Sequence, residues 1–270
     1  KENISKGLCV KAIIGVDYAG HPCDWVALRS IADRYGLQLV NDNCHAMGAK
    51  LLRNQKYAVS FADVVTQSYH PVKHITTGEG GSILTNDERL NEKVKCLRSH
   101  GMVKEKNKID NHGPWYYEMH EIGYNYRITD FQCALGMSQL KKLNRFIKSR
   151  IKISKKYDNY FKDHSFLKIP YIDKSVDHAF HLYPIQIDFK RLEIEKKMFF
   201  KNMMKDDIQL QVHYIPVHLQ PYYMSRFGYK RNDLPYAERF YTKEISLPIY
   251  PSLSESQVQK VAKTVLKHLN

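Results

Sequence analysis

The sequence predicts an α/β fold with two domains. Strand-like and helix-like segments alternate over the first hundred residues, which is typical of a layered α/β domain with a parallel sheet. After about residue 163 a second, shorter series of such segments begins. The chain has 270 residues, and domains usually have about 100 to 200 residues. We therefore expect a large three-layer α/β/α domain over residues 1–162, including a long linking helix, and a smaller α/β domain over residues 163–270.

The spacing of hydrophobic residues and the positions of capping residues predict the helices and strands of the large domain. Between its first two strands, Asp24 and Gly36 are placed to cap the two ends of a helix. Farther on, Thr129 can cap a long amphipathic helix that runs toward Tyr160. A shorter helix is marked by Leu90, Val94 and Leu97. Continuous β-rich runs predict strands at residues 10–16, 37–42, 62–68 and 81–86.

The small domain is predicted by the same signals. A helix is expected near residues 195–206, and the last helix begins at a capping box formed by Ser254 and Gln257. Strands are expected at residues 181–187, 208–215 and 244–250.

Composition and charge narrow the function classes. No run approaches the roughly 18 apolar residues of a spanning helix, and the start of the sequence has no signal-peptide core. The five widely spaced cysteines suit reduced thiols, so we expect a cytoplasmic protein. The net charge of +14 could attract nucleic acid, an acidic membrane or a phosphorylated small molecule, but the basic residues are spread along the chain. A solvated surface is their commonest meaning.

Three side chains gather at the predicted carboxyl edge of the sheet, where α/β proteins usually bind ligands. Asp42 and Ser68 end two strands, and Lys73 follows just before the glycines Gly78, Gly80 and Gly81. A partly desolvated lysine loses proton affinity, and its neutral amine can attack a carbonyl. A buried carboxylate needs a cation, such as the protonated ring nitrogen of a pyridine cofactor. Taken singly, these residues also fit a surface lysine and two turn formers.

The motifs that contain these residues resemble a known family. The chain contains D-x-x-H at residues 42–45, S-x-x-x-x-K at 68–73 and K-x-x-x-x-G-E-G-G at 73–81, followed downstream by "HGPWYYEMHEIGYNYRITDFQCALGMSQL" and "QVHYIPVHLQPYY". These motifs, in this order, resemble those of the DegT/DnrJ/EryC1/StrS sugar aminotransferases. These are pyridoxal phosphate-dependent transferases of fold type I, the aspartate aminotransferase fold. "SYHPVKHITTGEGG" and "VDYAG" look most like the branch that acts in pseudaminic acid synthesis. That branch aminates C4 of a UDP-linked 4-keto-6-deoxy-N-acetylhexosamine, and the amino group comes from glutamate.

The resemblance implies roles for the residues of the sheet edge. Lys73 would hold pyridoxal 5'-phosphate covalently and carry the transferred proton. Asp42 would pair with the ring nitrogen of the cofactor, and His45 would lie near its 3-hydroxyl group. Ser68 would bind the cofactor phosphate.

Three more positions are implied by the resemblance. Asn125 is similar to an asparagine that reaches the cofactor phosphate of the neighbouring subunit, so a homodimer is expected. His213 and Tyr18 correspond to positions expected to contact the substrate. Family members also carry a stretch before the strand at residue 10, which implies that the large domain is N-terminally truncated here.

Other interpretations stay open at this point. Similar family members that act as dehydratases carry histidine where this chain has Lys73, which favours transamination. The chain could also act on a different nucleotide sugar, or be an inactive fragment or a degenerate paralogue. A zinc site formed by His45, His70 and His74 lacks the cysteine or acidic ligand usual at such sites, and no basic cluster marks a nucleic-acid binder. We expect neither metal, nucleic acid nor membrane as a partner.

Overall fold

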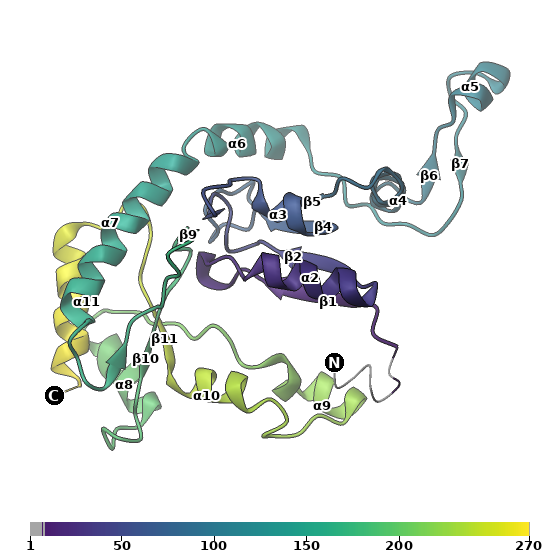
Figure 1. Ribbon diagram of the computed structural model, residues 1–270. Helices are drawn as coiled ribbons and strands as arrows, with labels where there is room; N and C mark the ends of the chain where they lie inside the picture. The colour runs from purple at the N-terminus through teal and green to yellow at the C-terminus, as the bar shows by residue number, and fades with distance from the viewer. Residues whose placement is uncertain (1–6, 8, 270) are drawn as a thin grey trace. The chain divides into compact units, whose positions relative to one another are not determined.

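The computed structural model describes residues 7 and 9–269, which form two compact units (Figure 1). The first unit comprises the chain up to Tyr18 and Pro22–Leu143, and the second comprises Ala19–His21 and the chain from Asn144 onward. Residues 144–162, which the sequence prediction counts with the large domain, are thus grouped with the second unit. Within the described residues, no helix is long and apolar enough to cross a membrane.

The first unit is built on a mixed sheet with the strand order β1-β2-β4-β5. The first three strands are parallel, as predicted. The last strand runs antiparallel to β4, because the glycine-rich turn sends the chain directly back along its neighbour. The strands are β1 (Ala12–Val16), β2 (Gln38–Asp42), β4 (Val64–Ser68) and β5 (Gly81–Leu84), so each predicted strand of this domain is confirmed.

Helix α2 (Trp25–Tyr35) packs closely against β1. A Cβ atom on Gly15 would lie 2.6 Å from Cη2 of the Trp25 ring, so only glycine allows this approach. Both predicted caps are confirmed: the Asp24 carboxylate accepts from Ala27 N at 3.0 Å, and Gly36 adopts a left-handed conformation with φ 61°. The helix therefore has a fixed position on the sheet.

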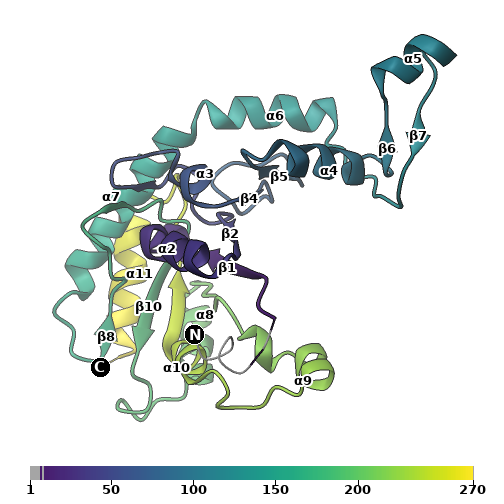
Figure 2. The ribbon, with the colours of Figure 1, turned by 45° about the vertical axis from the view of Figure 1, so that its right-hand side comes forward.

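The remaining elements of the first unit are short or peripheral. The hairpin of β6 and β7, which carries α5, projects away from the sheet of its own unit in both ribbon views (Figures 1 and 2). The bounds are β3 (Lys50–Leu51), α3 (Tyr57–Phe61), α4 (Glu88–Arg98), β6 (Met102–Val103), α5 (Lys106–His112), β7 (Glu118–Met119) and α6 (Asp130–Leu140). The short helix η1 (Tyr18–Gly20) contains residues of both units. The predicted helix around Leu90 is confirmed as α4.

The long helix predicted after Thr129 is two helices, α6 and α7 (Leu143–Phe161). The start is confirmed, since Thr129 and Gln132 form a reciprocal capping box. The prediction of one continuous helix is wrong, because the chain tightens after Leu140. There Lys142 N donates to Gln139 O at 2.9 Å, a bond across three residues that ends the α-helical pattern.

The second unit contains an antiparallel sheet with the order β11-β10-β8. The predicted strands at 181–187 and 244–250 are confirmed as β10 (Tyr183–Ile187) and β11 (Glu244–Leu247). The strand predicted at 208–215 is wrong, since this segment makes a single bridge between Gln211 and Ser246. The segment does not continue as a strand because the His213 amide N–H donates to the Glu244 side chain at 2.9 Å instead of to a neighbouring strand.

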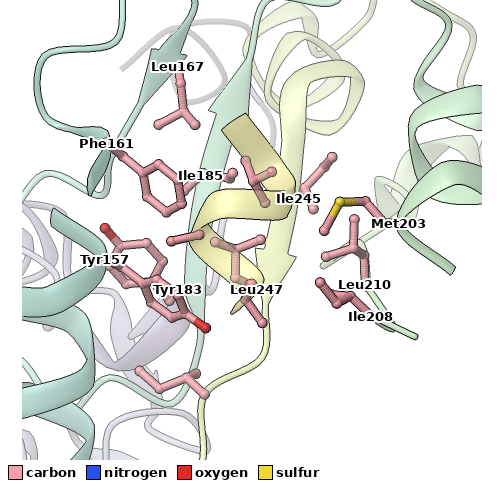
Figure 3. Packing of buried hydrophobic residues seen from close by; sticks show 14 of the residues in the cluster. Tyr157, Phe161, Leu167, Tyr183, Ile185, Met203, Ile208, Leu210, Ile245 and Leu247 are labelled. Atoms are coloured by element: carbon pink, nitrogen blue, oxygen red, sulfur yellow. The ribbon is translucent and has the colours of Figure 1, made fainter. Parts of the chain in front are cut away.

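Helices cover this second sheet and bury its core (Figure 3). The rings of Tyr157 and Tyr183 meet with centroids 4.9 Å apart, and Ile185 and Ile245 are fully buried. Helices α7 and α11 lie side by side in both ribbon views (Figures 1 and 2) and share this core. The predicted box at Ser254 caps α11. The other bounds are β8 (Leu167–Lys168), β9 (Val176–Asp177), α8 (Lys196–Lys205), η2 (Val217–Leu219), α9 (Pro221–Phe227), α10 (Pro235–Lys243) and α11 (Glu255–Lys267).

Candidate active site

The parallel strands of the first unit end at one common edge. Val16 pairs with Asp42, and Asp42 pairs with Thr66, so the carboxyl ends of strands β1, β2 and β4 lie at the same edge of the sheet. Asp17 N continues this register by donating to Asp42 O at 3.0 Å, and Asn43 N donates to Thr66 O at 3.1 Å. As the sequence predicts, Asp42 is the last residue of its strand.

Ser68 ends β4, and the loop that follows it is closed by hydrogen bonds. Ser68 pairs with Gly81 of β5, and Tyr69 N donates to Gly80 O at 2.9 Å. Gly80 has φ 154°, and a Cβ atom there would lie 2.5 Å from Thr77 Oγ1. Glycine is therefore required at position 80 by the close approach of the loop to itself. Lys73 lies in this loop, where its amide donates to His70 O at 3.0 Å.

The Lys73 side chain is half-buried, and its surroundings change its acidity. Burial lowers the pKa of the Lys73 ammonium, while the electrostatic influence of Cys44 and Asp42 acts in the opposite direction. Lys73, Asp42 and Cys44 therefore lie close enough to influence one another electrostatically. A larger fraction of neutral, nucleophilic amine is present there than on an exposed lysine.

Cys44 is a member of this group that the sequence analysis did not single out. Its amide N donates to Asp42 Oδ1 at 3.1 Å. Burial, followed by the hydrogen bond to Asp42, raises the pKa of the Cys44 thiol to about 11. The thiol is therefore protonated at neutral pH, and the anionic member of the group is Asp42. The sequence signal that could have identified Cys44 is its position two residues after Asp42, on the same turn.

A buried carboxylate, Asp17, holds the turns at this edge and was also missed. Asp17 is fully buried and accepts four hydrogen bonds. Its Oδ1 accepts from Cys23 N and Trp25 Nε1, both at 2.8 Å. Its Oδ2 accepts from Asn43 Nδ2 at 2.7 Å and from the Tyr57 hydroxyl at 2.8 Å. Because Asn43 directly follows Asp42, this network fixes the turn that carries the proposed ring partner.

The other predicted residues of this edge are held in the same region. His45 is 6% exposed, and its ring centroid lies 6.2 Å from that of Tyr18. The structure therefore brings together a predicted cofactor residue and a predicted substrate residue. Ser68 is half-buried, and its Oγ accepts from His70 N at 3.3 Å.

Asn125 and His213 are placed elsewhere in the chain. Asn125 is exposed and forms an isolated bridge with Ser99 just after α4. His213 belongs to the second unit, where its Nδ1 lies 2.8 Å from Ser246 Oγ. Their assigned roles, like those of the other predicted site residues, remain predictions.

The alternative zinc site does not form within the described residues. His45, His70 and His74 do not place their ligand atoms together, whereas Glu105, Glu118 and His120 place theirs within 4.8 Å of one another. In that group, Lys108 donates to Glu118, and its hydrogen bond, followed by those of His120 and Tyr116, lowers the pKa of Glu118 to about 2. A lysine cation thus already neutralises this carboxylate.

Comparison with known proteins identifies the family. The model of the DegT/DnrJ/EryC1/StrS aminotransferase family matches residues 2–266. The chain belongs to this family. The resemblance seen in the sequence motifs is therefore confirmed, and the fold is the fold type I of these aminotransferases.

Several relatives within the DegT/DnrJ/EryC1/StrS family are similar over nearly the whole chain. The uncharacterized protein MJ1066 of Methanocaldococcus jannaschii is 43% identical over 258 residues, which are 95% of this chain and 66% of that protein. The UDP-4-amino-4,6-dideoxy-N-acetyl-beta-L-altrosamine transaminase of Helicobacter pylori is 38% identical over 264 residues, 95% of this chain and 65% of the relative. The chain thus spans about two thirds of the length of these relatives.

A solved structure of the family supports the same conclusion about the fold. Helicobacter pylori PseC, an aminotransferase involved in the biosynthesis of pseudoaminic acid, matches with a TM-score of 0.86 and 36% identity. The match covers 96% of this chain and 67% of PseC.

Proposed function

We propose that the protein is a pyridoxal phosphate-dependent aminotransferase that acts on a nucleotide sugar. The observation that carries this proposal is the position of Lys73, a half-buried amine of lowered pKa within electrostatic reach of Asp42 at the ligand-binding edge of the sheet. The family to which the chain belongs supports the same activity. Lysine at this position favours transamination over dehydration.

The residues at the sheet edge fit the chemistry of pyridoxal 5'-phosphate. Lys73 supplies an amine for the cofactor carbonyl, and Asp42 supplies an anion for the ring nitrogen. His45 would lie at the 3-hydroxyl, and Ser68 would donate to the phosphate. When bound, the cofactor acts as an electron sink for the carbon whose proton leaves. Lys73, within the same group, is suited to carry that proton, because burial lowers its pKa toward neutral pH.

The proposed substrate is a UDP-4-keto-6-deoxy-N-acetylhexosamine, which would be aminated at C4 as in the pseudaminic acid pathway, with glutamate as the amino donor. Two observations support it: the 38% identity to the transaminase of Helicobacter pylori and the structural match to PseC. Tyr18 and His213 are the proposed contacts to the substrate. The competing possibility is a different nucleotide sugar, which a substrate panel separates.

We further propose a homodimer as the active unit and the cytoplasm as its location. Helix α6 has no buried residue within the first unit, and its Phe131 side chain is 91% exposed. Ile122 is 89% exposed in the segment that carries Asn125. Such apolar surface is suited to a protein interface, and a second copy is the occupant that would let Asn125 reach a neighbouring cofactor phosphate. The five cysteines are free thiols, as suits a reducing compartment.

Absorbance spectroscopy tests the cofactor assignment. The purified chain incubated with pyridoxal 5'-phosphate should show a visible band that borohydride fixes onto Lys73, as peptide mass analysis would confirm. Lys73→Ala should abolish this band, while Lys104→Ala, which removes an exposed lysine of the same unit, should keep it. A band of full intensity in Lys73→Ala would show that the assignment is wrong.

An activity assay tests the substrate. UDP-4-keto sugars that differ in stereochemistry at C5 are supplied with glutamate, and the aminated product is followed by mass spectrometry. A thymidine-linked keto sugar is the control nucleotide. Equal rates with both nucleotides would remove the assignment to the pseudaminic acid pathway.

A further inference from the structure

A chain of hydrogen bonds in the second unit links Glu244, Ser246 and His213. Glu244 and Ser246 are alternate residues of β11 and therefore project from the same face of the strand. The segment that carries His213 is registered against this strand: Ser246 N donates to Gln211 O at 2.9 Å, and Gln211 N donates to Ser246 O at 3.3 Å. The backbone thus places the imidazole over the two polar side chains.

Both carboxylate oxygens of Glu244 accept hydrogen bonds. Ser246 Oγ donates to Oε1 at 2.6 Å, and the His213 amide N–H donates to Oε2 at 2.9 Å. Glu244 is fully buried. Burial raises the pKa of its carboxyl group above the ordinary value, and the hydrogen bonds from Ser246 and His213 and the positive charge of Lys196 offset this rise only in part. A carboxyl group that accepts on both oxygens has the hydrogen-bonding pattern of the ionised form.

The direction of the remaining hydrogen bond follows from counting protons. A serine hydroxyl has one proton to donate, and Ser246 gives it to Glu244. Its oxygen can then only accept from His213 Nδ1, which lies 2.8 Å away. His213 Nδ1 must therefore carry a proton. In the neutral imidazole the lone pair is then on Nε2.

We propose that Glu244 and Ser246 are positioning residues that hold neutral His213 in the Nδ1–H tautomer, so that Nε2 accepts a hydrogen bond from a hydroxyl or amide N–H group of the sugar substrate. This inference rests on the proposed function, in which His213 contacts the substrate. A histidine fixed in this way recognises a hydrogen-bond donor and discriminates against sugars that lack one. At metal sites, a hydrogen bond to one ring nitrogen of a histidine likewise fixes the tautomer and orientation of the ring, so that the other nitrogen is presented to the metal.

A merely structural role predicts something different. If Ser246 served only to satisfy buried Glu244, its removal would lower the stability of the unit but would leave the tautomer of His213 unchanged. The tautomer is therefore the measurement that separates the two possibilities.

Nitrogen-15 NMR of histidine-labelled chain reads the tautomer directly, at a pH where the imidazoles are neutral. The signals of His213 are assigned by their loss in His213→Gln. We expect a protonated Nδ1 and an unprotonated Nε2. His218 gives an internal comparison in the same spectrum, because its Nε2 lies 2.9 Å from Glu238 Oε1 and the opposite tautomer is expected.

Substitution of Ser246 tests the cause. Ser246→Ala should move His213 toward the Nε2–H tautomer, and Ser246→Thr, which keeps the hydroxyl group, should restore the original signals. Ser225→Ala removes an exposed serine of the same unit and should change nothing. If Ser246→Ala does not fold by circular dichroism, Ser246→Cys takes its place, because it keeps the volume and has only a weak donor. An Nε2–H tautomer in the unsubstituted chain, or an unchanged tautomer in the folded variant, would overturn the proposal.

Kinetics provides the second readout. In Ser246→Ala, KM for the nucleotide sugar should rise about tenfold, the effect of one lost hydrogen bond. The half-reaction with glutamate should stay unchanged. An equal loss in both half-reactions would contradict a role toward the sugar. The NMR result stands even if no transamination is found, so failure of the proposed function is distinguishable from failure of this inference.

Discussion

The Tyr57 hydroxyl offers the sharpest test of the buried network at the sheet edge. It donates to Asp17 Oδ2 at 2.8 Å and accepts from Asn43 Nδ2 at 2.7 Å, and Tyr57 itself is 1% exposed. Tyr57→Phe removes one donor from a buried carboxylate that keeps three others. A hydrogen bond to a charged group contributes about 1.5–3 kcal/mol. We therefore expect the free energy of unfolding of the first unit to fall by about this amount.

Trp25 is a local reporter for this measurement. It is fully buried, and its Nε1 donates to the same Asp17 carboxylate at 2.8 Å. The other tryptophan, Trp115, is 74% exposed. Urea unfolding followed by tryptophan fluorescence in a Trp115→Phe background therefore reports the surroundings of Asp17. The shift in midpoint, multiplied by an unchanged m value, gives the change in free energy.

A matched control removes a hydroxyl group that takes no part in the network. Tyr35 is half-buried at the end of α2, and Tyr35→Phe should change the free energy of unfolding by no more than about 0.5 kcal/mol. Equal losses in the two variants, or no loss in Tyr57→Phe, would refute the view that Asp17 depends on these donors.

Two further predictions concern the loop that contains Lys73. A lysine whose pKa is lower in the folded state than its unfolded value of 10.5 costs stability fully below the folded pKa, and this cost disappears as the pH rises to 10.5. Lys73→Met should therefore raise the urea midpoint at pH 7, and the gain should vanish by about pH 11; a gain independent of pH would contradict the burial of the ammonium. Gly81→Ala would place a Cβ atom 2.6 Å from Gln67 O and should cost about 1–3 kcal/mol. It should also speed hydrogen exchange at the β4–β5 amides, and unchanged exchange there would contradict the close packing of Gly81 against Gln67.

The parts of the fold that sequence could predict are those set by local signals. The strands of the first unit, and the caps at Asp24 and Ser254, are encoded by neighbouring residues and were all confirmed. The positions of Asp42 and Ser68 at strand ends follow from the same local patterns. What depends on distant partners was not predictable in this way.

Two wrong predictions show this dependence. The apolar pattern after Thr129 continues through residue 151, so it gives no sign of the break after Leu140. The segment 208–215 has the composition of a strand, but the His213 amide is taken by the side chain of Glu244, 31 residues away. Likewise, nothing next to Asp17 reveals that its donors include Tyr57, 40 residues on. Such pairings are fixed only when the sheets form.

The antiparallel return of β5 explains how a lysine on a loop can occupy a defined site. Ser68 pairs with Gly81, so the loop that carries Lys73 leaves the sheet and rejoins it at the same place. Inside that closure, Thr77 N donates to Tyr69 O at 3.0 Å, which shortens the free span around Lys73 further. A loop with both ends fixed loses less conformational entropy when its side chain is bound. Gly80 and Gly81 permit the closure on which the proximity of Lys73 to Asp42 depends, because a Cβ atom at either position would collide with Thr77 Oγ1 or Gln67 O.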